Sequence, residues 1–433
     1  MITLLAAVFG GLILLLISGL WIAVATGGIG ITLYFINSGW SALTPISHIV
    51  WTSAENFPIA TVPLFIFLGY MLMESGLAGR VYAGLEPLLN HIPGGLLHTN
   101  IVVGALFAAC SGSGMASAAA IGTVALPEME KRGYPRSLSI GSVAAGGVLA
   151  PIIPPSIMMI MYCVITGQSI GKAFIAGIFP GLGLAVLFSL YIAVVFQFYQ
   201  DWAKTRGPLV PLKKSISASK EVWPIVILIF LVLGTIYLGI ATPTESAAVG
   251  SVGAIVLAAL HRGLNWQSLK KTTVATVTLT SVVLIIYIGT HIMSSALAMS
   301  GAIGFITQGL TSLAVPRVGV LLIVYLIFII LGLFIDTLPM MLMTVPLVFP
   351  TIVALGYDPL WFGIAVVLLT NTGNLTPPVG MILFVMQSLN RGRPVSEVYK
   401  GVIPFAVLCV VMLGIVTAFP QIALWLPTQM LGK

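Results

Sequence analysis

The stretches GGVLAPIIPPS (146–156) and TNTGNLTPPVG (370–380) decide the fold of this chain. Each carries two adjacent prolines inside an otherwise apolar run. A proline removes a backbone N–H group and clashes with the preceding turn, so two in a row must open a helix. Opened backbone at membrane depth is tolerated only where it lines a cavity or meets a ligand. We therefore expect two broken membrane helices with free backbone groups at their centres.

The composition around these stretches is that of a membrane protein. Of the 433 residues, 59% are hydrophobic and 7% are charged, whereas a soluble domain carries about 25% charged residues. This excludes a soluble globular enzyme and a disordered protein. The net charge of +7 does not indicate a nucleic-acid partner, because the basic residues form short clusters between long apolar runs. That pattern is typical of the cytoplasmic loops of a protein embedded in the lipid bilayer.

The apolar runs divide the chain into membrane spans, since about 20 apolar residues cross a bilayer core. Two further apolar stretches, about 100–130 and about 318–353, are interrupted by CSGSGMAS (110–117) and GLFIDTLP (332–339) and predict re-entrant hairpins. The ten predicted crossing spans are 2–24, 27–45, 59–75, 137–166, 173–198, 223–241, 245–261, 274–298, 360–389 and 399–419.

A collinear series of identities indicates an internal duplication. Ser75-Gly76 matches Ser300-Gly301 at an offset of 225, and Pro154-Pro155 matches Pro377-Pro378 at an offset of 223. The series predicts a first repeat over 1–198, with its broken helix at about 137–166. It also predicts a charged linker over 199–221 and a second repeat over 222–433, with its broken helix at about 360–389.

The charges orient the two copies. Lys131, Arg132 and Arg136 follow the first hairpin, whereas Arg391 and Arg393 follow the second broken helix. Basic loops stay cytoplasmic, so the repeats are predicted to be inverted, with the linker inside and both termini outside. The predicted fold is an all-α polytopic membrane protein, in which each repeat has five crossing helices, one of them broken, and one re-entrant hairpin. This is the architecture of secondary transporters; a purely structural or receptor-like bundle is the alternative.

Asp336 is the single residue that indicates a functional site most strongly, because a carboxylate within an apolar membrane stretch is energetically costly. We interpret it as part of a cation site. Two alternatives stay open: the side chain caps the following turn, or it carries a proton with a raised pKa. Ser111 and Ser113 occupy the corresponding tip of the first hairpin, where small-residue packing is the other interpretation. The five histidines are dispersed and show no metal-binding spacing.

At these motifs the chain resembles a known family. The run SGSGMASAAAIGTVALPEMEKRGYPRSLSIGSVAAGGVLAPIIPPS (111–156), with SIGKAFIAGIFPG (169–181), YLGIATPTESAAVG (237–250) and GNLTPPVG (373–380), resembles the large, DctM-type membrane subunit of tripartite ATP-independent periplasmic (TRAP) transporters. The resemblance covers essentially the whole chain. It implies a bacterial inner-membrane protein, a small four-helix membrane subunit and an extracytoplasmic solute-binding protein as partners. It also implies Na⁺-driven import of an organic anion, such as a C4-dicarboxylate or sialic acid, by an elevator-type movement.

The resemblance also implies site residues, with Na⁺ as the coupling ion and no organic cofactor. The first Na⁺ site would use Ser111, Ser113 and carbonyls around Ala150, Ile153 and Pro155, and the second Gly332, Asp336, Gly373 and Thr376. The solute would lie near Ser113, Gly114, Asp336, Thr337 and Asn374. Many relatives carry glycine at the position of Ala150, and alanine restricts the backbone there.

Four other functions are alternatives to this one. A stand-alone Na⁺ symporter of the related divalent-anion superfamily would need no binding protein. A membrane-embedded enzyme would need a nucleophile–base pair or a metal cluster, and the sequence offers neither. Direct ATP drive would need a Walker motif, which is not present, and a channel would need short filter repeats.

Overall fold

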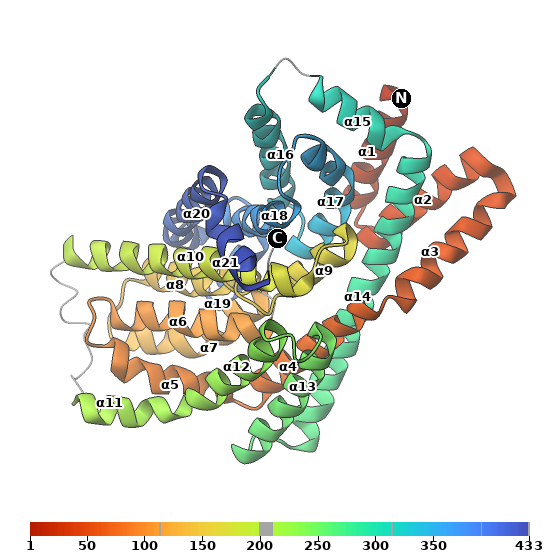
Figure 1. Ribbon diagram of the computed structural model, residues 1–433. Helices are drawn as coiled ribbons and strands as arrows, with labels where there is room; N and C mark the ends of the chain where they lie inside the picture. Colours follow the sequence, from red (N-terminus) through yellow and green to blue (C-terminus); the bar gives the residue numbers. More distant parts are fainter. Residues whose placement is uncertain (112–113, 199–210, 313–314, 391, 432–433) are drawn as a thin grey trace.

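A computed structural model describes the chain except for residues 112–113, 199–210, 313–314, 391 and 432–433, and except for the side chains of 78, 108–111, 212–214 and 431. Every regular element in the described part of the chain is helical (Figure 1), which confirms the predicted all-α fold. Seven of the described helices are long and apolar enough to cross a membrane. The shorter apolar helices include four arms or halves of the predicted hairpins and broken helices.

The first half of the chain follows the predicted order of spans, hairpin and broken helix. Its elements are α1 (Ile2–Ile17), α2 (Ile22–Ser38), η1 (Gly39–Ala42), α3 (Leu43–Glu55), η2 (Phe57–Ala60), α4 (Thr61–Glu74), α5 (Leu77–Leu89), α6 (Gly95–Ser111), α7 (Gly114–Lys131), α8 (Arg136–Val148), α9 (Ile157–Thr166) and α10 (Ile170–Phe198).

The second half repeats that order. Its elements are α11 (Leu212–Ala218), η4 (Ser219–Glu221), α12 (Trp223–Tyr237), α13 (Pro243–Leu260), α14 (Trp266–Met299), α15 (Ala302–Thr311), α16 (Arg317–Gly332), α17 (Thr337–Ala354), α18 (Pro359–Leu375), α19 (Met381–Leu389), α20 (Val395–Ala418) and α21 (Gln421–Leu431).

Some boundaries differ from the predicted ones. The first helix ends at Ile17 and not at 24, because Gly19 takes a left-handed conformation (φ 82°) that ends the helix. The described part of the predicted linker, 211–221, is largely helical. It packs on α5, where a Cβ atom on Gly84 would lie 3.0 Å from the carbonyl oxygen of Ala218 (Figure 1). The helix α21 was not predicted; it lies along α10, and Trp425 stacks on Phe179.

The two halves of the chain make equivalent contacts with each other. By the sequence offset, α2 corresponds to α13, and α4 corresponds to the later part of α14. The helix α2 packs on α14, where Gly30 lies against the backbone of Met293, and α13 packs on α4, where Gly250 lies against Leu68. Each contact is therefore the counterpart of the other, as a twofold relation between the repeats would give. The opposite membrane orientation of the repeats stays a prediction.

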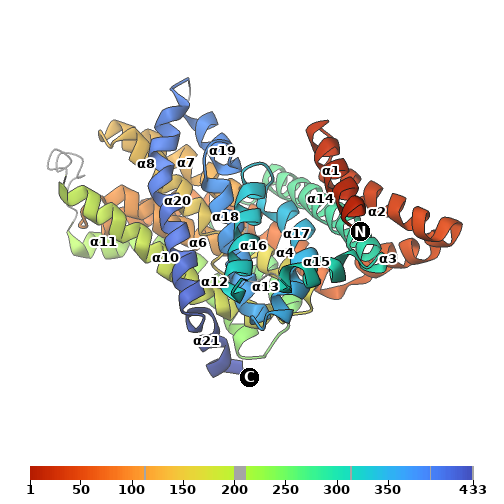
Figure 2. The same cartoon turned by 90° about the horizontal axis from the view of Figure 1, so that it is seen from above.

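Matched turns share their conformations as well. Gly76 and Gly301 both have a φ of 75° and precede α5 and α15, respectively. The Pro154–Pro155 and Pro377–Pro378 peptide bonds are both cis. Figures 1 and 2 show α2 and α3 at one end of the molecule, next to α14, and α5 with α11 at the opposite end.

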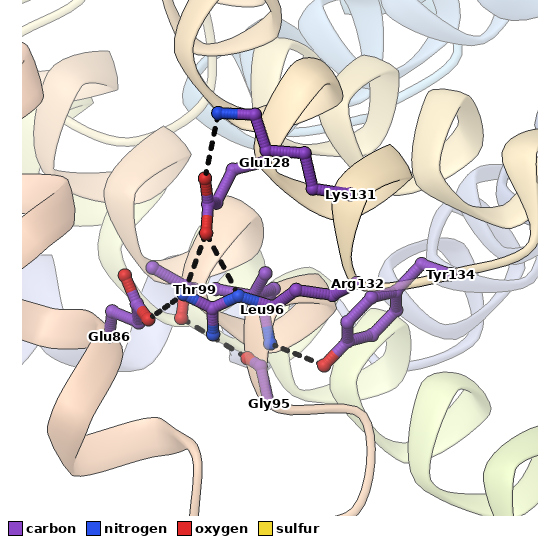
Figure 3. A network of polar contacts seen from close by, with 8 residues as sticks. All are labelled: Glu86, Gly95, Leu96, Thr99, Glu128, Lys131, Arg132 and Tyr134. Carbon is purple, nitrogen blue, oxygen red and sulfur yellow. Dashed lines mark hydrogen bonds and ion pairs between the residues drawn. The ribbon is translucent and has the colours of Figure 1, made fainter. Parts of the chain in front are cut away.

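Ion pairs of Arg132, Arg136 and Arg393 connect several helix ends. We call the surface that carries these residues the basic face. Arg132, just after α7, donates hydrogen bonds to Glu86 of α5 and to Glu128 of α7 (Figure 3). Burial lowers the pKa of this guanidinium, but the bonds to the two carboxylates outweigh burial and raise that pKa. Glu130 pairs with both Arg136 and Arg393, which ties the base of the first hairpin to the turn before α20.

Candidate functional site

Each hairpin lies with its tip against the broken helix of its own repeat. The helix α7 starts at Gly114, and a Cβ atom on Gly147 of α8 would lie 2.7 Å from the carbonyl oxygen of Gly114. In the second repeat, a Cβ atom on Gly373 of α18 would lie 2.7 Å from the Cα atom of Gly332, the last residue of α16. Only glycine allows backbones to approach so closely. These glycines therefore set how deep the hairpin tips lie.

Each hairpin also contacts the other repeat. The helix α7 packs on α19, and α17 packs on α9. The second half of each broken helix is thus covered by the hairpin of the opposite repeat. As a result, both hairpin tips and both helix breaks meet in the middle of the molecule.

A small cavity of about 70 Å³ lies at this meeting point. Its walls come from the hairpins, from the broken helices and from two helices outside them, α4 and α14. The lining residues are Ile66, Gly114, Met115, Pro151, Ile157, Met158, Leu279, Val283, Asp336, Thr337, Leu338, Asn371, Asn374 and Ile382. We call this the central cavity.

Asp336 is the one charged side chain among the described residues that line the central cavity. It is the N-cap of α17, and its Oδ1 atom accepts hydrogen bonds from the backbone N–H of Thr337 at 2.8 Å and from Nδ2 of Asn374 at 3.0 Å. Such N-caps satisfy an amide that the helix leaves free. The predicted cap is therefore present, and the same carboxylate also faces the cavity.

Two asparagines that line the cavity with Asp336 each have an amide oxygen without a partner among the described residues. Oδ1 of Asn371 and Oδ1 of Asn374 are buried and receive no hydrogen bond from any described residue. The Nδ2 atom of Asn371 donates to the carbonyl oxygen of Val367 at 2.7 Å, which directs its oxygen elsewhere. A buried acceptor without a partner costs about 1–3 kcal/mol. The carboxylate and both amide oxygens form a set of oxygen ligands suited to a small hard cation.

Four helix N-termini converge on the same cavity. The helices α7, α9, α17 and α19 begin at Gly114, Ile157, Thr337 and Met381, and the first or second residue of each lines the cavity. The N-terminus of a helix carries about half a positive charge and presents free N–H groups. Their convergence favours an anion, so one cavity offers groups for both signs of charge.

Several backbone carbonyls at the helix breaks have no hydrogen-bond donor among the described residues. Among the described residues, none donates a hydrogen bond to the carbonyl oxygens of Ala150, Ile153, Pro155 or Gly332. By contrast, the carbonyl oxygen of Gly373 accepts from the backbone N–H of Thr376 at 3.1 Å. Unwound carbonyls of this kind coordinate Na⁺ in membrane transporters.

The structure brings together four of the five residues predicted to contact the solute: Gly114, Asp336, Thr337 and Asn374 all line the central cavity. Ser113 and the side chain of Ser111 lie outside the described part of the chain. Thr376 ends α18 and donates its hydroxyl to the carbonyl oxygen of Thr372 at 2.6 Å. It does not line the cavity.

Sequence reasoning missed Asn371 and the wall from α4 and α14. Asn371 lies one helical turn before Asn374 on the same face, so the i, i+3 spacing was an available signal. Ile66, Leu279 and Val283 are apolar residues in apolar helices, and no local pattern marks them. Within the described part of the chain, no group of three or more His, Cys, Asp or Glu residues could hold a metal ion.

A helical bundle in which two broken helices and two hairpins meet at a cavity lined by a carboxylate and two asparagines has the architecture of a membrane transport protein. Residues 9–422 match the family model of the tripartite ATP-independent periplasmic transporter, DctM component. The chain therefore belongs to the family of DctM components, the large membrane permeases of TRAP transporters. Members of this family are permeases and not enzymes.

Similarity to individual proteins supports this family assignment. The C4-dicarboxylate TRAP transporter large permease protein DctM of Pseudomonas aeruginosa is 32% identical over 87% of this chain and 88% of its own length. The sialic acid TRAP transporter large permease protein SiaM of Vibrio cholerae is 30% identical over 95% of this chain and 98% of its own length. The crystal structure of the Alcanivorax borkumensis YdaH transporter has a similar fold, with a TM-score of 0.62, 14% identity, and coverage of 88% of this chain and 90% of that one.

Proposed function

We propose that this chain is the translocation subunit of a Na⁺-coupled, binding-protein-dependent secondary transporter that imports an organic anion. The observation that carries the proposal is the central cavity itself. Asp336 and two asparagines with unpartnered amide oxygens line it, and so do the first residues of four helices. A site with both features suits a small cation bound next to an anionic solute.

The proposed coupling ion is Na⁺, held at two related places. The second Na⁺ site would use the carboxylate of Asp336 with oxygens of Gly332, Gly373 and Thr376. The first would use the free carbonyls of Ala150, Ile153 and Pro155 with Ser111 and Ser113. Bound Na⁺ would neutralise charge in the cavity, so the solute anion would bind more tightly when the ion is present. That linkage is what couples the solute to the ion gradient.

The solute class follows from chemistry and from relatives. Converging helix N-termini suit a carboxylate, and two similar permeases are named for C4-dicarboxylates and for sialic acid. The family is described as tripartite and periplasmic. We therefore propose two protein partners: a small four-helix subunit in the bilayer, and a binding protein that delivers the solute from the periplasm.

The orientation follows from charge. The described ion pairs join helix ends on the basic face, and basic loops remain in the cytoplasm. We propose that the basic face is cytoplasmic in the bacterial inner membrane and that both termini are periplasmic.

The movement proposed is of the elevator type. The hairpins and broken helices would move as one unit against a scaffold that contains α2, α4, α13 and α14. The central cavity supports this division, because Ile66, Leu279 and Val283 of the scaffold face Asp336 and Asn374 of the other unit.

Uptake into proteoliposomes tests the proposal. The chain would be reconstituted with its membrane partner, with the binding protein outside, under imposed Na⁺, K⁺ or pH gradients. We expect uptake only with the Na⁺ gradient and the binding protein, and at least a tenfold loss for Asp336→Asn. The matched control is Asp358→Asn, which changes another N-cap aspartate at an exposed helix start.

Two other outcomes would replace the proposal. Full uptake without the binding protein would identify a stand-alone symporter. Uptake driven by a pH gradient alone would make Asp336 a proton carrier and remove the two Na⁺ sites.

A further inference from the structure

A second cavity, of about 490 Å³, lies between α3 and α14 on one side and α9 and α17 on the other. We call it the outer cavity. The wall from α17 is apolar and includes Leu342, Pro346 and Phe349. The wall from α3 and α14 is polar and consists of Thr52, Asn56, Tyr287, Thr290, His291 and Ser294. No Asp, Glu, Lys or Arg residue is among the described residues that line it.

The outer cavity lies far from the basic face. Lys271, which pairs with Glu74 on the basic face, lies near the start of α14, and Thr290 follows it by nineteen residues, or roughly 30 Å at 1.5 Å per residue. This is the thickness of the bilayer core. The central cavity lies between them along the same helix, at Leu279 and Val283. The two cavities therefore follow one another along α14, and the outer one is on the side from which a periplasmic partner would deliver a solute.

The polar wall offers hydrogen-bond acceptors. Asn56 lines both this cavity and the neighbouring one, and its buried Oδ1 atom has no partner among the described residues. Thr52 and Thr290 each donate their hydroxyl hydrogen to a backbone carbonyl of their own helix at 2.8 Å, so their oxygens are left to accept. A ligand that satisfies these three oxygens must bring hydrogen-bond donors.

The wall is also held in place. Nδ1 of His291 lies 3.0 Å from Oγ of Ser53, and the His291 ring stacks on Tyr287 with 5.6 Å between ring centroids. These contacts fix both rings at the cavity surface. A site whose side chains are fixed before binding loses less entropy when a ligand arrives.

We propose that the outer cavity is a binding site for the hydroxyl-bearing part of the solute, occupied before the solute reaches the hairpin tips. The volume is within the range of about 300–1,000 Å³ that holds small molecules. No Asp, Glu, Lys or Arg residue is among the described residues of this wall, and the hydroxyl oxygens of Thr52 and Thr290 are left to accept, so the wall suits hydroxyl groups better than a carboxylate. The inference rests on the proposed function, and it narrows the solute to a hydroxylated organic acid.

A lipid chain is the competing occupant, because the opposite wall is apolar. A hydrocarbon chain would leave Oδ1 of Asn56 without a hydrogen bond, at a cost of about 1–3 kcal/mol. A hydroxylated solute satisfies that oxygen and still covers the apolar wall with its carbon skeleton. The unpaired oxygen therefore favours the solute.

The test measures binding to the membrane complex in nanodiscs, in choline buffer without Na⁺ and without the binding protein. Gluconate and sialic acid serve as hydroxylated probes, and hexanoate serves as an acid of similar length without hydroxyl groups. We expect a thermal shift with at least one hydroxylated probe and none with hexanoate. Asn56→Leu and the nearly isosteric Thr290→Val should each weaken that binding at least fivefold.

The control variant is Thr278→Val, which removes a hydroxyl from the exposed side of the same helix and should bind like the wild type. Three results would overturn the inference: no binding of either hydroxylated probe, equal binding by wild type and both cavity variants, or equal binding of hexanoate. Because Na⁺ is omitted here and required in the uptake assay, failure of this inference is distinct from failure of the proposed function.

Discussion

Asn374 donates a hydrogen bond from Nδ2 to Oδ1 of Asp336 across 3.0 Å, and this bond joins the tip of the second hairpin to the broken helix α18. Both residues line the central cavity. The bond fixes one carboxylate oxygen and turns the amide oxygen of Asn374 away from any described partner. Asn374 can therefore both position the carboxylate and supply an oxygen of its own.

The first prediction concerns this pair. Asn374→Leu keeps the side-chain volume but removes the bond that fixes the carboxylate of Asp336, a ligand of the proposed second Na⁺ site. We expect the Na⁺ concentration for half-maximal uptake to rise at least tenfold. The control is Thr370→Val, which removes a buried hydroxyl one turn earlier on α18, outside the cavity lining. An unchanged Na⁺ dependence in Asn374→Leu would place the ion elsewhere.

The sequence revealed the parts of this site that carry a local signal. Adjacent prolines mark the helix breaks, and a carboxylate in an apolar run marks Asp336, because both are costly inside a membrane. Asn374 entered the prediction through the resemblance to the family. Leu279 and Val283 could not be predicted, because their place at the cavity depends on how α14 packs against the other unit.

The close approach of Gly373 and Gly332 gives the second prediction. In Gly373→Ala, the new Cβ atom would lie 2.7 Å from the Cα atom of Gly332, so the hairpin tip must move away from α18. Overpacking of this kind costs about 1–3 kcal/mol. We expect uptake to fall at least tenfold while the protein remains folded in the membrane. Gly414→Ala is the matched control, since no atom lies within 4 Å of its Cβ position. Equal uptake by both variants would contradict a role for this contact.

The third prediction separates half-buried from exposed ion pairs on the basic face. The side chains of Arg132 and Glu86 are 22% and 20% exposed, and Nη1 of Arg132 has no partner among the described residues. Glu86→Gln leaves the guanidinium with Glu128 as its one paired carboxylate. We expect a loss of about 1–3 kcal/mol, seen as a fall of several degrees in the apparent Tm in detergent.

The control for that measurement is Glu74→Gln. Glu74 pairs with Lys271 at 3.6 Å, and their side chains are 35% and 58% exposed, so water screens the pair. Exposed pairs contribute about 0–1 kcal/mol. A fall in Tm as large for Glu74→Gln as for Glu86→Gln would show that burial of Arg132 does not decide the effect.

The last prediction tests whether the ion sites belong to the moving unit alone. Val283 is 1% exposed and reaches the central cavity from α14, whereas the neighbouring Val282 is 40% exposed on the outside of the same helix. Val283→Trp would fill the space between α14 and the hairpin tips, and the elevator movement requires that space to change. We expect at least a tenfold loss of uptake by Val283→Trp and little change for Val282→Trp. Na⁺ binding, measured as a thermal shift, should persist in both variants, because all the proposed ion ligands lie on the hairpins and broken helices. Loss of Na⁺ binding in Val283→Trp would instead make α14 part of the ion site and contradict the division into scaffold and moving unit.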